Sequence, residues 1–108
     1  DSVKSRGLGD VYKRQVNGLE TFYFQSFQGK KLSSLIHDSI LRTVRRKDRG
    51  VKEARFYVIR RTNSPASLVE LGFLTGTADA ADLADPAHRR QLALAIAVGI
   101  LNYLRVAG

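Results

Sequence analysis

Residues 63–74 read NSPASLVELGFL. Within this stretch an apolar run begins after Pro65 and ends in a single carboxylate, Glu70. Its β-prone side chains predict a strand at residues 66–70, with Gly72 and Phe73 close behind the acid. If the run is buried, the carboxylate loses hydration, so either a partner offsets that cost or its proton affinity rises. Both outcomes suit a catalytic acid or base. The alternative is a structural glutamate at the solvent-exposed end of a strand.

Two more strands are predicted upstream of this stretch. Residues 54–60 are rich in β-forming side chains and are flanked by charge. Residues 21–24 form a short aromatic run after the turn-like pair Asn17-Gly18. The connection at residues 61–65 is too short for a crossover helix, so the strands on either side of it pair antiparallel if they are neighbours.

Two main helices are predicted from the spacing of apolar residues. Across residues 30–46 the apolar side chains recur every three or four positions and form one stripe. Gly50 is expected to close this helix. A second helix is expected at residues 86–104, because Asp85 is a good N-cap and Pro86 a good first helical residue.

Gly99 lies in the middle of the second helix, where a glycine costs about 1 kcal/mol relative to alanine. Its presence predicts close contact with another backbone. A short acidic helical turn at residues 78–83 precedes the helix. The predicted fold class is therefore α/β, with an incomplete sheet of about three short strands flanked by two main helices.

The length of 108 residues allows at most one domain and is short for a complete enzyme. Cysteine is absent, which excludes disulfide frameworks and thiolate metal sites. No apolar run approaches the roughly 20 residues that span a bilayer, and no signal-peptide pattern opens the chain, so no transmembrane segment is expected. Because no initiating Met is present, the chain is expected to be an internal or C-terminal piece.

The net charge of +8 is concentrated in one block, residues 30–61. This block holds eleven of the 18 Lys/Arg residues and three of the ten acidic residues. Such a block implies an anionic partner or a solvated face. A specific nucleic-acid site is not expected, because the only interleaved aromatic residues, Phe56 and Tyr57, belong to a predicted strand. A solvated basic face that meets an anionic envelope polymer is the preferred interpretation.

Residues 1–15 show neither helical nor strand periodicity. The run DVYKRQ at residues 10–15 resembles one reading frame of the mosaic-end adapter used in transposase-based sequencing libraries. We therefore expect an adapter-derived or disordered segment at residues 1–15 and a folded part at residues 16–108. A native disordered tail is the alternative.

Metal and nucleophile patterns are weak throughout the sequence. The two histidines, His37 and His88, lie on different predicted helices without a metal-binding spacing, and both are expected to be ordinary surface residues. No motif connects Ser64 or Ser67 to a histidine, and no Gly-x-Ser-x-Gly elbow occurs. No glycine-rich phosphate loop is present either.

Several longer motifs occur in a fixed order at close spacing. They are GLETFYF at residues 18–24, DRGVK at 48–52, FYVIR at 56–60, PASLVELGFL at 65–74, and Gly99-Ile100 with Tyr103. Together they resemble the C-terminal half of the zinc-dependent N-acetylmuramoyl-L-alanine amidases, the peptidoglycan-cleaving family often called Amidase_3. Ser64 and Gly76 stand where members commonly have Met and Asn, and neither departure touches Glu70.

The resemblance implies a role for Glu70, since the glutamate of the Leu-Val-Glu-x-Gly-Phe motif is catalytic in that family. The implied reaction is hydrolysis of the amide between N-acetylmuramic acid and L-Ala of the stem peptide in the bacterial cell envelope, periplasmic or extracellular. Zinc would activate a water, and the carboxylate would take its proton and pass it to the leaving amine. The implied cofactor is therefore Zn²⁺ and the implied partner is peptidoglycan.

The family's zinc ligands, two histidines and a glutamate, belong to the half upstream of Gly18, so the resemblance names no ligand in this chain. The sequence therefore predicts a fragment truncated from a larger amidase domain, with no amidase activity of its own even when zinc is added. Two alternatives remain open. One is a non-enzymatic module that binds an anionic polymer through residues 30–61, and the other is an inert fragment.

Overall fold

The computed structural model describes residues 17–73 and 76–107 of the chain. The expectation for residues 1–15 therefore lies outside the described residues. The elements, in chain order, are β1 (Leu19–Tyr23), α2 (Phe27–Thr43), β2 (Asp48–Glu53), α3 (Tyr57–Arg60), β3 (Leu68–Glu70), α4 (Thr77–Ala84) and α5 (Pro86–Ala107).

The three strands form one mixed sheet in the order β2-β1-β3. β1 pairs with β2 in parallel and with β3 antiparallel. The parallel pair requires a crossover connection, which α2 supplies. The predicted α/β class, with a three-stranded sheet and two main helices, is confirmed.

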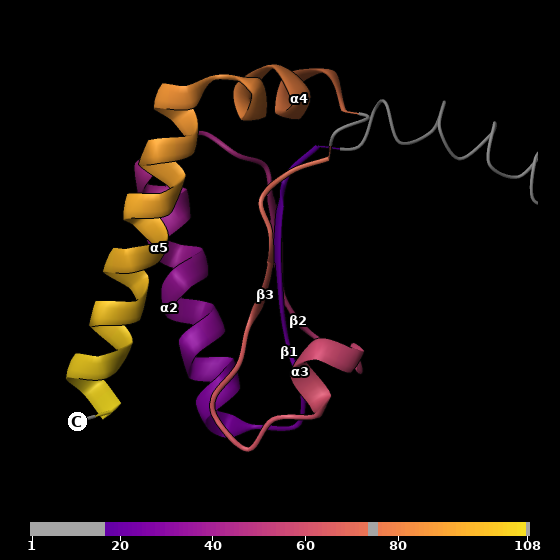
Figure 1. The fold of residues 1–108 in the computed structure, drawn as a ribbon, viewed down its shortest axis with the longest axis vertical. Coiled ribbons are helices and arrows are strands. Elements are labelled where there is room, and N and C mark those ends of the chain that lie inside the picture. The colour runs from indigo at the N-terminus through magenta and orange to yellow at the C-terminus, as the bar shows by residue number, and fades with distance from the viewer. Residues whose placement is uncertain (1–16, 74–75, 108) are drawn as a thin grey trace, which may run out of the picture.

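Both long helices pack on one side of the sheet. α2 and α5 lie side by side there, and α4 crosses the upper end (Figure 1). The buried core lies between these helices and β1, and it consists of Leu19, Ile36, Ile40, Val44, Leu92 and Ala95. Val69 of β3 packs against the same core. The apolar stripe predicted on the first helix is thus the face of α2 that is buried.

The first helix begins and ends earlier than the predicted range of residues 30–46. Ser26 is its N-cap, and its side chain accepts a hydrogen bond from the Gly29 N–H at 2.9 Å. At the other end the backbone of Val44 is extended and its N–H bonds to the carbonyl of Ile40. Gly50 does not close the helix; it lies within β2 at a φ of 93°, a conformation that suits glycine.

The strand predicted at residues 54–60 is wrong. The strand is Asp48–Glu53, and Tyr57–Arg60 is a short helix. The β-forming side chains of residues 56–58 are exposed, whereas the polar segment before them pairs in parallel with β1. Pairing with a neighbouring strand therefore outweighs local β propensity here. β2 and β3 are not neighbours, because β1 lies between them.

The C-terminal helix was predicted closely. It begins at Pro86, and the Asp85 carboxylate accepts a hydrogen bond from the Ala87 N–H at 3.0 Å. The predicted close contact at Gly99 is also confirmed. A Cβ placed on Gly99 would lie 2.5 Å from the Cα of Ile36 and 3.0 Å from the carbonyl oxygen of Leu35. Glycine is therefore required where α5 crosses α2.

Replacing Gly99 with alanine should lower stability despite the better helix propensity of alanine. The propensity gain is about 1 kcal/mol, whereas overpacking against a backbone costs about 1–3 kcal/mol. We expect a net loss of up to about 2 kcal/mol in the free energy of unfolding, measured by urea denaturation. A variant more stable than the wild type would show that the two helix backbones are not in contact.

One side of α5 remains exposed. Leu94, Leu101 and Leu104 are each more than half exposed. This helix is also the one among the described residues that has the length and hydropathy to cross a membrane, and 22% of its apolar 18-residue stretch is buried. That is weak evidence, because a core helix of a soluble domain has the same character. The absence of a membrane-spanning segment therefore stays a prediction.

Candidate active site

Glu70 is the last residue of β3 and is half-buried. Its neighbour Val69 is opposite Thr21 of β1, and both face α2, since Thr21 Oγ1 lies 2.8 Å from His37 Nδ1. Side chains alternate along a strand, so Glu70 points to the opposite side of the sheet. Its cross-strand partner Glu20 points the same way. The predicted strand-end carboxylate is therefore on the face that α2 and α5 leave open.

The charge of Glu20 is balanced by cations from β2. Lys52 Nζ donates to Glu20 Oε2, and Arg49 Nε lies 3.9 Å from Glu20 Oε1. The Arg49 guanidinium also lies 5.4 Å from the ring centroid of Phe73. Among the salt bridges of the described residues, none includes Glu70. Of the two facing carboxylates, Glu20 is thus paired, whereas Glu70 has no salt-bridge partner among the described residues.

A buried arginine fixes the backbone just after Glu70. Arg46 Nε donates to the carbonyl oxygen of Leu71 at 2.8 Å, and its side chain is 1% exposed. Its guanidinium also bonds to Asp82 at 3.0 Å and lies 3.0 Å from His88 Nε2. Asp79, from α4, is 3.7 Å away. Arg46 therefore joins the end of β3 to α4 and α5.

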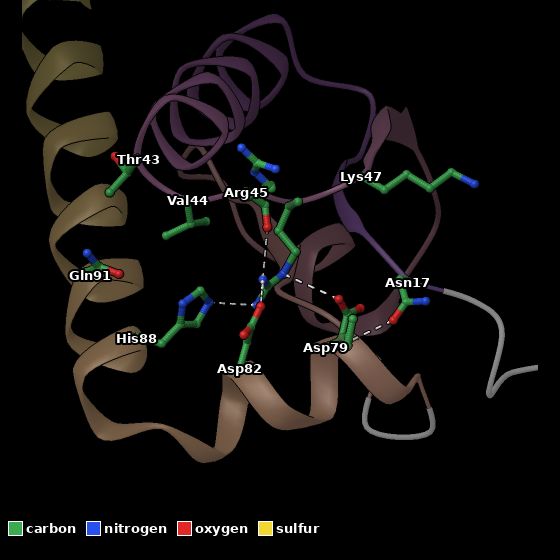
Figure 2. A pocket seen from close by; sticks show the side chains of 11 residues that line it. Asn17, Thr43, Val44, Arg45, Lys47, Asp79, Asp82, His88 and Gln91 are labelled. Atoms are coloured by element: carbon green, nitrogen blue, oxygen red, sulfur yellow. Dashed lines mark hydrogen bonds and ion pairs between the residues drawn. The ribbon is translucent and has the colours of Figure 1, made fainter.

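Asp79 also holds the backbone that follows β3. Its Oδ2 accepts the Phe73 N–H and the Gly18 N–H, each at 2.9 Å, and the residue is 2% exposed. These bonds connect the loop after β3 to the start of β1. Figure 2 shows Asp79 and Asp82 converging from α4, with His88 and Gln91 on the adjoining helix α5. The cavity between them has a volume of about 570 Å³. Glu70 does not line this cavity.

The histidines are not the surface residues that were predicted. His37 is 3% exposed and connects α2 to two strands, through Thr21 and through a 2.7 Å contact between its Nε2 and Asp48 Oδ1. His88 is half-buried beside Arg46. His37 lies on the α2 side of the sheet, away from Glu70. Both histidines therefore serve packing and hydrogen bonding.

Asp48 gives this contact a measurable pH dependence. The hydrogen bond from His37 holds the pKa of the Asp48 carboxyl below its ordinary value of 3.8, and the Gly50 N–H adds to the shift. A lowered folded-state pKa means that the stabilisation is present above the ordinary pKa and is lost as pH falls through the folded-state value. The carboxylate is 59% exposed, so the effect should stay below about 1 kcal/mol.

We expect the free energy of unfolding of the wild type to fall more steeply below about pH 4 than that of Asp48→Asn. Urea denaturation at several pH values between neutral and strongly acidic conditions measures the difference. Parallel curves for the two proteins would contradict the assigned hydrogen bond.

The basic block at residues 30–61 is only partly a solvated face. Arg46 is buried, and Arg49 and Lys52 approach Glu20. Sequence reasoning missed Arg46 and Asp79, since nothing in a run of basic residues or in a short acidic helix indicates that one member of each is buried. Within residues 17–73 and 76–107, no group of three His, Cys, Asp or Glu side chains could hold a metal ion.

Comparison with known protein families gives one match over most of the chain. Residues 9–102 match Amidase_3, described as N-acetylmuramoyl-L-alanine amidase. The match therefore includes residues 9–15, which belong to the segment that was expected to be adapter-derived or disordered.

Individual relatives agree with this match. The N-acetylmuramoyl-L-alanine amidase LytC of Bacillus subtilis is 37% identical over 82% of this chain and 18% of its own length. The solved structure of the amidase AmiC2 of Nostoc punctiforme is 42% identical with a TM-score of 0.81, covering 85% of this chain and 51% of that one. An amidase structure from Clostridium difficile 630 is 35% identical with a TM-score of 0.83, covering 88% of this chain and 52% of that one. The chain thus spans about half the length of these two solved structures.

Proposed function

Since this chain belongs to the Amidase_3 family of N-acetylmuramoyl-L-alanine amidases, we propose that it is the half of a peptidoglycan amidase domain that supplies the general acid/base, Glu70. The observation that carries the proposal is the position of this carboxylate. Glu70 ends β3 on the open face of the sheet, and the backbone that follows it is held by Arg46 and Asp79. A proton-transferring group requires such a fixed position.

The chemistry proposed for Glu70 is two successive proton transfers. Its carboxylate accepts a proton from the water that attacks the amide carbonyl, and it then donates that proton to the departing amine of L-Ala. The water oxygen bonds to the lactyl carbonyl carbon and the C–N bond breaks, which gives a carboxylic acid and a free amine. The second proton of the water then passes from the new carboxyl group to the amine, so the products are a carboxylate and an ammonium group. The salt-bridged Glu20 is not suited to this role, because its negative charge is already stabilised by Lys52 and Arg49.

Zinc is the cofactor that the family resemblance implies for a complete enzyme. The residues described for this chain do not fit a zinc site, since no three-ligand group occurs among them and His37 lies across the sheet from Glu70. The reaction steps assigned to this chain are therefore confined to Glu70.

The proposed substrate is the amide between N-acetylmuramic acid and L-Ala of the stem peptide, and the proposed place of action is the cell envelope, periplasmic or extracellular. The names of the relatives support both, since several are N-acetylmuramoyl-L-alanine amidases or probable cell wall amidases. A basic module that binds an anionic polymer is less well supported, because Arg46 is buried and two other cations of the block approach Glu20.

We further propose that residues 16–108 form the amidase-derived part and that residues 1–15 do not belong to it. The described elements within residues 19–107 support the folded part of this division, whereas the family match begins at residue 9, inside the segment that is proposed not to belong. The coding sequence upstream of Val16 in an uninterrupted copy of the gene tests it. A strand-end His, a Glu and a second His in that sequence are expected, and a native gene encoding residues 1–15 unchanged would contradict the boundary.

A chimera tests the proposed function directly. Residues 17–107 would replace the matching half of the Nostoc punctiforme amidase, and peptide release from purified peptidoglycan would be measured with zinc present. We expect release by the chimera and none by the 108-residue chain alone. A folded chimera without activity would contradict the proposal, and release by the chain alone would contradict the prediction that the fragment is inactive.

A further inference from the structure

The short helix α3 brings exposed aromatic and basic side chains together. Tyr57 is 62% exposed, and the guanidinium carbons of Arg60 and Arg61 lie 5.3 Å and 5.0 Å from its ring centroid. Both distances are within the range of cation–π contacts. One aromatic ring therefore orients two arginines at the surface.

This cluster adjoins the sheet face that carries Glu70. Phe56, the residue before α3, packs edge-to-face on Phe22 with ring centroids 5.0 Å apart. Phe22 follows Glu20 by two positions on β1, so its side chain is on the Glu70 side of the sheet. The Phe22–Phe56 contact thus connects α3 to the candidate active site.

The positive charge of the cluster is not neutralised within the described residues. Neither Arg60 nor Arg61 takes part in a salt bridge there, in contrast to Arg46 and Arg49. An aromatic ring orients a guanidinium without cancelling its charge, and the N–H groups of arginine match the geometry of a carboxylate. The two arginines are therefore available to an anionic ligand.

Arg60 also lines a polar cavity of about 220 Å³ at this end of the sheet. The polar residues around it are Gln25, Ser26, Thr62, Asn63 and Ser64. Gln25 has a φ of 43°, and it is the one non-glycine residue with positive φ among the described residues. Backbone strain of this kind concentrates at functional sites. The cavity therefore offers hydroxyl and amide donors next to an arginine.

The distance from Glu70 to this cluster suits a short peptide. Leu68 is two positions from Glu70, about 7 Å along the strand, and it lies opposite Phe22. The Phe56 ring is a further 5.0 Å from Phe22. An extended peptide of four residues reaches about 13 Å. A stem peptide with its first amide at Glu70 would therefore extend along this face of the sheet toward Phe56, the residue before α3.

We infer that Tyr57, Arg60 and Arg61 form a subsite that binds a free carboxylate of the stem peptide, several residues from the scissile amide. This inference rests on the proposed function, because only a peptide held with its amide at Glu70 would place a carboxylate near α3. The arginines donate charge-assisted hydrogen bonds to that carboxylate, and Tyr57 holds their guanidinium groups in position. The subsite gives the amidase domain a preference for substrates that carry the acid.

Binding by the 108-residue chain tests the subsite without any hydrolysis. The ¹⁵N-labelled chain would be titrated with a synthetic N-acetylmuramoyl-tetrapeptide and with the same compound after conversion of its peptide carboxylates to carboxamides. We expect amide shifts centred on α3 and residues 62–64, and a Kd about tenfold weaker for the carboxamide form, which corresponds to about 1.4 kcal/mol. The double variant Arg60→Gln/Arg61→Gln should weaken binding of the acid form by about the same factor.

Two matched variants separate charge from folding. Arg60→Lys/Arg61→Lys keeps the charge and should restore part of the affinity, whereas Arg90→Gln removes an exposed arginine of α5 and should change nothing. The dispersion of the amide spectrum shows whether each variant is folded. Equal affinity for the acid and carboxamide forms would overturn the subsite, and so would the absence of peptide binding by the folded wild-type chain.

Hydrolysis by the chimera distinguishes failure of the subsite from failure of the proposed function. If the chimera cleaves peptidoglycan while the arginine variants bind as tightly as the wild type, the subsite is wrong and the function stands. If the chain prefers the acid form as expected but a folded chimera cleaves nothing, the carboxylate site stands and the amidase function is wrong.

Discussion

Replacing Glu70 with glutamine in the chimera should lower kcat by about 10²–10⁴-fold, the range that general acid–base catalysis contributes. Glutamine has nearly the same size and keeps a hydrogen-bonding group, but it cannot accept the proton of the attacking water. KM should change little, because the interaction is lost mainly in the transition state. Initial rates of peptide release at several substrate concentrations give both constants.

Asp38→Asn is the matched control for that measurement. It neutralises an exposed carboxylate on α2, across the sheet from Glu70, and should leave kcat within about twofold of the wild type. The thermal midpoints of both variants should match that of the parent chimera. Equal activity of Glu70→Gln and Asp38→Asn would remove Glu70 from the mechanism.

Replacing Asp79 with alanine should lower the free energy of unfolding of the chain by about 3–5 kcal/mol, as breaking a buried ion pair does. The variant loses the bonds from the Gly18 and Phe73 N–H groups and leaves Arg46 with less charge compensation in the interior. Such a loss is a large fraction of the stability of a small domain. Urea denaturation followed by circular dichroism measures it.

Asp82→Ala provides the comparison within the same cluster. Asp82 bonds to the same arginine at 3.0 Å, but its side chain is 47% exposed. Its replacement should therefore cost at most about 1 kcal/mol. If the two substitutions destabilise the chain equally, burial of Asp79 is not the source of its contribution.

The helices could be predicted because their information is local. The apolar stripe of residues 30–46 and the cap formed by Asp85 and Pro86 both appear in α2 and α5. The start of α2 at Phe27 was missed because the predicted range began at residue 30, just after Gly29. It lies in the first turn of the helix, where its N–H is capped by Ser26 and a Cβ would be 3.2 Å from the carbonyl oxygen of Ala66.

The second strand could not be predicted because its cause is not local. Residues 56–58 are the better β-formers, yet Asp48–Glu53 is the segment that α2 brings beside β1. The ion pair between Lys52 and Glu20 adds to that pairing. Propensity describes how a segment fits a sheet, and it does not identify the neighbour that the chain supplies.

In the candidate site, too, local features could be predicted from the sequence, whereas contacts between distant segments could not. The motif predicted that Glu70 ends a strand, and this is confirmed, whereas its catalytic role stays a proposal. That Glu20 lies opposite it depends on strand register, which a one-residue slip would change completely. The burial of Arg46 depends on where α4 and α5 pack. Neither contact follows from the order of residues along the chain.

The identity of the cleaved bond shows whether Glu70 takes part in hydrolysis of the N-acetylmuramoyl-L-alanine amide. Products released from purified peptidoglycan by the wild-type chimera would be analysed by mass spectrometry after labelling of new amino groups. We expect one new amino group, on L-Ala, and stem peptides free of N-acetylmuramic acid, with release abolished or strongly reduced by Glu70→Gln. Cleavage at a different bond, or cleavage at this bond that Glu70→Gln leaves unchanged, would contradict this expectation.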